Sequence, residues 1–205
     1  MRIALLVFLM SAGIVVADGL AQAETRDGPV IRVRIYDYAK TPNDTVPDAQ
    51  RLAANFYTAI GVTIDWAPTF GPHARKNKNA APGRLQDFTI NILSRDMVAR
   101  TTWAKDAIGS AVVAPEGGGR IAYVLYDRLQ QAAFAANWPV KDLLAVVIAH
   151  ELGHLLLPPG IRSDGLMRPG WDVAELRHIR ARDLSFTRDE MALIHERLAE
   201  VVATE

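Results

Sequence analysis

The sequence predicts a single α+β domain in which a mixed sheet of about five strands packs on a buried helix. Short segments with apolar residues at every second position are typical of half-buried strands. The segment between Pro139 and Pro158 is apolar nearly all round a helical projection, as expected of a helix enclosed in a core. Pro- and Gly-rich turns separate these segments, and 205 residues are enough for one domain with a core.

The predicted domain begins with a strand and a helix. Residues 30–36 alternate Ile and Val with Arg and Tyr, which is the period of a strand with one buried face. A helix is expected over residues 45–60, where Thr45 and Asp48 have the spacing of an N-terminal cap. Gly61 suits the turn that ends this helix.

Four further strands are expected because their segments alternate in the same way and turn residues separate them. These are residues 62–66, 87–93, 108–114 and 121–126. The intervening segment 67–86 is rich in Pro, Gly, Asn and basic residues, so we interpret it as an exposed loop.

Helices are expected in the C-terminal half of the chain. Residues 127–137 form one, and the apolar helix after Pro139 has to stop at the Pro-Pro-Gly sequence that starts at Pro158. In the last helix, Thr187 and Glu190 have the spacing of a capping box. His195 lies at the edge of the apolar stripe of that helix and is expected to be structural.

The N-terminal residues have the pattern of a secretory signal peptide. Arg2 precedes an apolar run, residues 3–16, that is too short to cross a bilayer, and Ala21-Gln22-Ala23 is a small-x-small cleavage site. We expect cleavage after Ala23, a folded domain over residues 24–205, and a secreted or periplasmic protein without a stable membrane anchor.

Composition narrows the expected partners. The chain has 23 basic and 23 acidic side chains, so no charge excess indicates nucleic acid or an anionic membrane as a partner. It has no cysteine, which excludes disulfides, thiolate metal ligands and a lipid anchor on cysteine.

The sequence His150-Glu151-Leu152-Gly153-His154 lies within the apolar helix. Residues four apart share one face of a helix, so both imidazoles are expected to approach one point that suits a zinc ion. Glu151 is placed to take a proton from an attacking water as a general base. The alternative is a buried histidine pair that is satisfied by hydrogen bonds.

The motif and a Gly-Leu-Met sequence that starts at Gly165 resemble the metzincin clan of zinc endopeptidases, which have a zincin-like fold. Four segments also resemble a group of uncharacterised exported bacterial proteins labelled as metalloproteases. They are residues 108–111, 122–128, 149–157 and 165–171. The resemblance implies a zinc metallopeptidase in which Met167 forms an apolar floor beneath the zinc. It also implies that residues 108–113 form the edge strand that pairs with an extended peptide.

One metzincin ligand is not matched. The clan has a third histidine six residues after the second, and Gly160 occupies that position here. A catalytic zinc needs three protein ligands and one open position. Asp164, between the helix and the Met-containing turn, is our candidate for the third ligand, and Glu175 and His178 are the next candidates. The alternative for Asp164 is a turn residue, because Asp followed by Gly is typical of turns.

The expected function is zinc-dependent hydrolysis of peptide bonds in a peptide or protein substrate. His150 and His154 would hold the zinc, which polarises the carbonyl, and Glu151 would act as the base. One rival is a zincin-fold protein that binds a peptide or partner without turnover. Another is an exported structural domain without metal.

Overall fold

A computed structural model describes residues 28–68, 86–115, 117–161, 163–170 and 173–203. The predicted signal peptide and most of the predicted loop 67–86 lie outside these ranges. In chain order the elements are β1 (Val30–Asp37), α1 (Thr45–Thr58), β2 (Thr63–Ala67), β3 (Gln86–Leu93), α2 (Arg95–Ala99), β4 (Gly109–Val113), β5 (Gly119–Leu125), α3 (Tyr126–Ala136), α4 (Val140–Leu156), α5 (Val173–His178), the 3-10 helix η1 (Ala181–Asp183) and α6 (Arg188–Ala203).

The five strands form one mixed sheet in the order β2-β1-β3-β5-β4. Every neighbouring pair is parallel except β4 and β5, which run antiparallel. The prediction of a mixed sheet of about five strands is therefore confirmed. Strand β4 pairs only with β5 among the described residues, so it is an edge strand.

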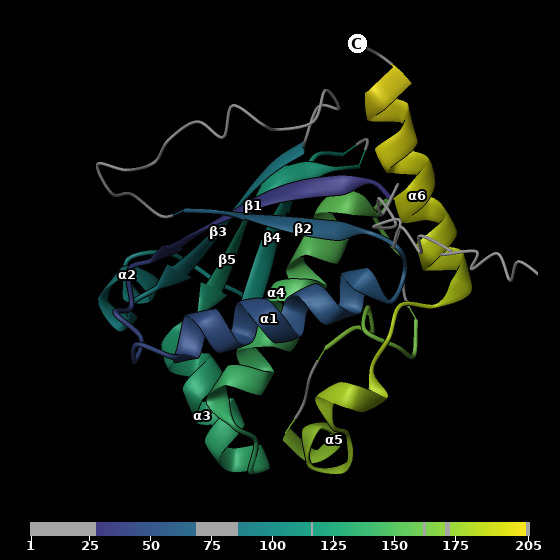
Figure 1. The fold of residues 1–205 in the computed structure, drawn as a ribbon. Coiled ribbons are helices and arrows are strands. Elements are labelled where there is room, and N and C mark those ends of the chain that lie inside the picture. Colours follow the sequence, from purple (N-terminus) through teal and green to yellow (C-terminus); the bar gives the residue numbers. More distant parts are fainter. Residues whose placement is uncertain (1–27, 69–85, 116, 162, 171–172, 204–205) are drawn as a thin grey trace, which may run out of the picture.

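Alternation along β1 sets the two faces of the sheet. Ile31, Val33 and Ile35 are buried, whereas Arg32 and Arg34 on the other face are partly or fully exposed. Figure 1 shows α1, α3 and α4 together on one side of the sheet. The apolar side chains of the strands face this helical layer, which makes an α/β sandwich of two layers.

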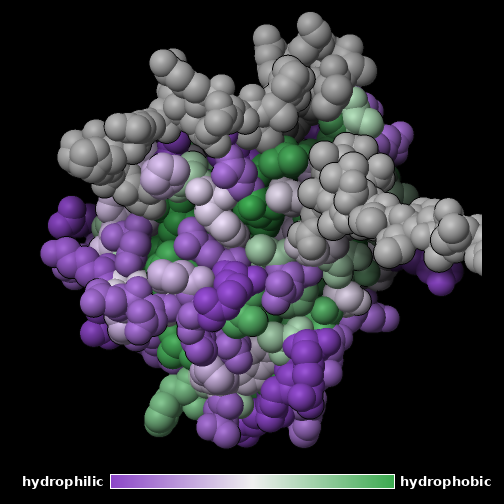
Figure 2. Space-filling view, viewed as in Figure 1, coloured by the Kyte–Doolittle hydropathy of each residue, from purple (hydrophilic) through white to green (hydrophobic). Residues whose placement is uncertain are grey.

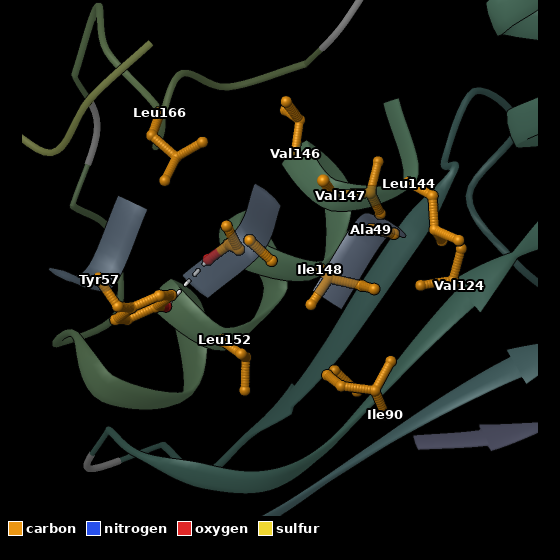
Figure 3. Packing of buried hydrophobic residues seen from close by; sticks show 14 of the residues in the cluster. Ala49, Tyr57, Ile90, Val124, Leu144, Val146, Val147, Ile148, Leu152 and Leu166 are labelled. Carbon is orange, nitrogen blue, oxygen red and sulfur yellow. Dashed lines mark hydrogen bonds between the residues drawn. The ribbon is translucent and has the colours of Figure 1, made fainter. Parts of the chain in front are cut away.

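Helix α4 is the centre of the core. Almost every residue from Leu143 to Leu156 is buried, and the helix contacts β4, β5 and α1. In Figure 3, Leu144, Ile148 and Leu152 point toward the strand residues Ile90 and Val124. A helix without a polar face is stable here because the sheet and α1 enclose it.

The start of α1 differs from the expectation. The helix already includes Thr45, its N-cap is Asp44, and no side chain caps it. The predicted cap by Thr45 and Asp48 is therefore wrong. The Asp48 carboxylate instead binds Arg51 at 2.7 Å and Lys141, at the start of α4, at 2.6 Å.

Helix α6 begins as predicted. The Thr187 N–H donates to the Glu190 carboxylate at 2.7 Å, and the Glu190 N–H donates to the Thr187 hydroxyl at 3.2 Å. His195 Nε2 lies 2.6 Å from the carbonyl of Ile60 and therefore donates to it. This bond ties α6 to the end of α1, so the structural role expected of His195 is confirmed.

Hydrophilic residues predominate among the described residues on the face shown in Figure 2, and hydrophobic ones form small separate patches. Within the described ranges, no helix has the combined length and apolar character that a membrane span needs.

Candidate functional site

Helix α4 brings its two histidines together. The Nε2 atoms of His150 and His154 are 3.0 Å apart, and the ring centroids are separated by 4.6 Å with perpendicular planes. This is the convergence that the four-residue spacing predicts. Without metal, such a contact also satisfies the alternative of a hydrogen-bonded histidine pair.

The backbone of the Met-containing turn fixes the tautomer of His150. His150 Nδ1 lies 2.8 Å from the carbonyl oxygen of Leu166, which can only accept, so Nδ1 carries the proton. In the neutral ring Nε2 then carries the lone pair, and this atom faces Nε2 of His154. Burial lowers the pKa of His150 to about 4 and also lowers the pKa of His154. Both rings are therefore neutral near pH 7, as metal ligation requires.

Glu151 lies against the edge strand. It is 5% exposed, and burial raises the pKa of its carboxyl to about 8, opposed by the N–H that Ala111 donates to it. A Cβ added at Gly109 would overlap the Glu151 carboxyl. The glycine therefore allows the strand and the carboxyl to lie in direct contact.

These groups share one pocket of about 380 Å³ between α4 and the strand β4. Its described lining contains no Lys or Arg, so a cation that balances a buried carboxylate has to come from outside this set. The lining residues are Asp106, Ala107, Ile108, Gly109, Ser110, Ala111, Val113, Val147, His150, Glu151, His154 and Gly170.

Met167 packs beneath the motif. It is buried, and a Cβ added at Gly153 would overlap its sulfur and come within 3.3 Å of Phe186. The Gly of the motif thus lets the Met-containing turn approach α4 closely. This contact places the Leu166 carbonyl within reach of His150.

Tyr57 of α1 also supports α4. Its hydroxyl donates to the carbonyl of Ala149 at 3.0 Å, the dashed line in Figure 3, and its ring meets Phe186 edge-on with centroids 5.2 Å apart. The tyrosine therefore anchors the residue that directly precedes His150.

The candidates for a third ligand lie elsewhere. Asp164 is exposed and does not line the pocket. Glu175 on α5 accepts from Arg168 at 3.0 Å, and His178 is exposed at the end of α5. No cluster of three His, Cys, Asp or Glu residues able to hold a metal occurs in the described part of the chain. Ligation by Asp164 stays a prediction.

The two imidazoles nevertheless fit zinc. Zn–N bonds of about 2.0–2.1 Å at a tetrahedral angle separate two nitrogen ligands by about 3.3 Å. The observed 3.0 Å is close to that value. The carbonyl bonded to His150 Nδ1 is the kind of second contact that orients metal-ligating histidines.

The roles of two pocket residues were not expected from the sequence. Gly109 is a glycine at the start of a predicted strand, and nothing in the sequence indicates that it contacts Glu151. Asp106 lies in a loop without a motif. Their proximity to Glu151 and the histidines results from the packing of α4 against β4, the strand that pairs with β5 at the edge of the sheet.

Comparisons with known proteins give structural likenesses but no match of sequence. No protein-family model and no curated protein matches the sequence. The solved structure of archaemetzincin from Methanopyrus kandleri is similar to this chain with 14% identity and a TM-score of 0.48, and the match covers 84% of this chain and 98% of that one. A likeness at this level does not establish shared chemistry, so any function has to be supported by the residues of α4 and its pocket.

Proposed function

We propose that the protein is an exported zinc metallopeptidase of zincin type that hydrolyses peptide bonds. One observation carries the proposal. Two neutral imidazoles and a buried carboxyl meet in one pocket beside an edge strand. Burying these three polar groups is unfavourable unless a partner such as a metal ion compensates them.

His150 and His154 would hold the ion through their Nε2 atoms. When bound, zinc supplies Lewis-acid polarisation of the substrate carbonyl. The Leu166 carbonyl holds His150 in the tautomer that ligation needs, and Met167 supports the helix from below. Asp164 is the proposed third ligand, which an Asp164→Ala variant tests by its zinc affinity.

Glu151 would accept the proton of the attacking water. The N–H of Ala111 holds the carboxyl beside β4, and a nearby dication favours its ionised form despite burial. The carboxyl can then pass the proton to the leaving amine, as general acid–base catalysis requires.

The free side of β4 would bind the substrate backbone. Among the described strands, β4 has only β5 as a neighbour, so an extended peptide can add to its other side by main-chain hydrogen bonds. The pocket lies against this strand, which would bring a peptide carbonyl to the histidines and Glu151.

The test combines metal analysis with cleavage. Protein purified after export should contain one zinc per chain, begin near Glu24 and cleave members of a diverse peptide library. The His154→Ala variant should lose both the zinc and the cleavage. Zinc-free wild-type protein would overturn the proposal.

A zinc-loaded wild type that binds peptides without cleaving any would favour the rival, a peptide-binding protein without turnover. Within the described ranges no three potential metal ligands lie together, and this observation favours the rival.

A further inference from the structure

We propose that Asp106 selects substrates that carry a cationic group, the side chain of Lys or Arg, close to the bond that is cut. The inference rests on the proposed peptidase function and names the substrate class of the same site. Asp106 lines the pocket that contains His150, Glu151 and His154.

The Asp106 carboxylate is available to a ligand. It is exposed, and no hydrogen bond or ion pair involves its side chain in the ranges that the structure describes. The adjacent Lys105 forms no ion pair with it. The described lining of the pocket contains no Lys or Arg. A substrate cation would therefore bind the carboxylate without competition from a basic side chain of the lining.

The loop that carries Asp106 is held in place by the rest of the fold. Arg128, in the first turn of α3, donates through Nη1 to the carbonyls of Ala104 at 2.6 Å, Lys105 at 3.2 Å and Ala107 at 3.1 Å. The Ala107 N–H also closes the turn, because it donates to the carbonyl oxygen of Ala104 at 3.2 Å. These contacts from one guanidinium fix the backbone on both sides of Asp106, which lowers the backbone entropy lost when a ligand binds there.

The distance along the chain limits where the cation can lie in the substrate. Gly109, which contacts Glu151, lies three positions after Asp106, and three steps along the chain span at most about 10 Å. The selected side chain therefore lies within about three positions of the bond that is cut. Ammonium and guanidinium groups form charge-assisted hydrogen bonds with a carboxylate, whereas a neutral chain of equal length does not.

The experiment compares peptides that differ only in one side chain. Each position within three residues of the cut bond carries either Lys or norleucine, which has a neutral side chain of similar length. We expect kcat/KM to favour Lys by about 10-fold at one position, which corresponds to about 1.4 kcal/mol. The preference should shrink as ionic strength rises, because salt screens exposed charges.

The Asp106→Asn variant should bring this ratio close to one by lowering kcat/KM for the Lys peptide, and it should keep its zinc. The matched control is Asp96→Asn, which removes an exposed carboxylate on α2 outside the pocket and should leave the ratio unchanged. Zinc-loaded Glu151→Gln should bind the Lys peptide more tightly than the norleucine peptide, which tests selection without turnover.

The outcomes separate the inference from the proposed function. Cleavage without a preference for Lys, or a preference that survives Asp106→Asn, overturns the inference alone. Loss of zinc in Asp106→Asn overturns it as well and identifies Asp106 as a metal ligand. If N-terminal acetylation of the peptides removes the preference, the selected ammonium is the chain terminus and not a side chain. If no peptide is cleaved or bound, the peptidase function and the inference both fall.

Discussion

Glu151 is a carboxyl whose surroundings favour the neutral form until a cation arrives. Burial dominates the rise of its pKa to about 8, and the single N–H from Ala111 opposes this only in part. A zinc ion at the histidines would add the missing positive charge beside the carboxyl. Metal binding and ionisation of the proposed base are therefore linked.

Replacing this carboxyl tests its role as the base. Glu151→Gln preserves the shape of the side chain but cannot accept a proton from water. We expect hydrolysis to fall by about 10²–10⁴-fold, the range of general-base contributions. Zinc measured in the purified variant should equal that of the wild type. Residual hydrolysis near the wild-type rate would assign the base to another residue.

The contact between Gly109 and Glu151 gives a second prediction. In Gly109→Ala the new Cβ would overlap the carboxyl, so Glu151 has to move away from Ala111. We expect kcat to fall by at least about 10-fold with zinc retained, because small misplacements of catalytic groups are costly. Val112→Ala, an exposed position on the same strand, is the control and should keep the wild-type kcat. An unchanged kcat in Gly109→Ala would contradict the proposed position of the base.

At the scale of elements, the pairing of α1 with α4 holds the motif in position. The Tyr57 hydroxyl is fully buried and its partner is the Ala149 carbonyl. Tyr57→Phe should lower the free energy of unfolding by about 1 kcal/mol, the usual net value of one hydrogen bond. Urea unfolding monitored by circular dichroism measures this change. Tyr38→Phe, which alters an exposed ring, should change stability much less, and equal losses would argue against the hydrogen bond.

Elements with a local cause could be predicted from the sequence. The alternation that predicted β1 reflects one buried face, and the capping box of α6 needs only Thr187 and Glu190. The cap of α1 was predicted wrongly because Lys141, 93 residues from Asp48, binds that carboxylate. The short helices α2 and α5 were not predicted, since five or six residues carry too little periodicity.

The same distinction applies to the site. The convergence of His150 and His154 follows from the helical repeat, so the sequence was sufficient. The positions of Asp106 and Gly109 relative to Glu151 depend on how β4 joins the sheet, which no local pattern encodes.

At the scale of the whole molecule, one acidic group and two basic groups of the site make the free energy of unfolding of the metal-free protein depend on pH. The pKa of Glu151 is raised from 4.5 to about 8 on folding. Its contribution to the free energy of unfolding is therefore lost as the pH rises from 4.5 toward 8. The pKa of His150 is lowered from 6.5 to about 4 on folding. Its contribution to the free energy of unfolding is therefore lost as the pH falls from 6.5 toward 4. The lowered pKa of His154 adds to the acid side.

We therefore expect metal-free protein to be most stable near pH 6.5. Between pH 6.5 and 8 Glu151 should lower the free energy of unfolding by about 1.4 kcal/mol per pH unit. Denaturant unfolding of chelator-treated protein measures this slope. The Glu151→Gln variant should lack the alkaline loss, and an identical slope in both proteins would contradict the raised pKa.

The burial of α4 has a consequence for how the site can be lost. A helix at the centre of the core cannot open alone, because its removal exposes the faces of both the sheet and α1. Amide protons at the centre of such an element exchange with solvent only when the whole domain unfolds. Deuterium uptake at residues 146–153 should then report the global free energy of unfolding. The arrangement of His150, His154 and Glu151 would therefore form and be lost together with the fold. No partly folded state would then lack the site alone.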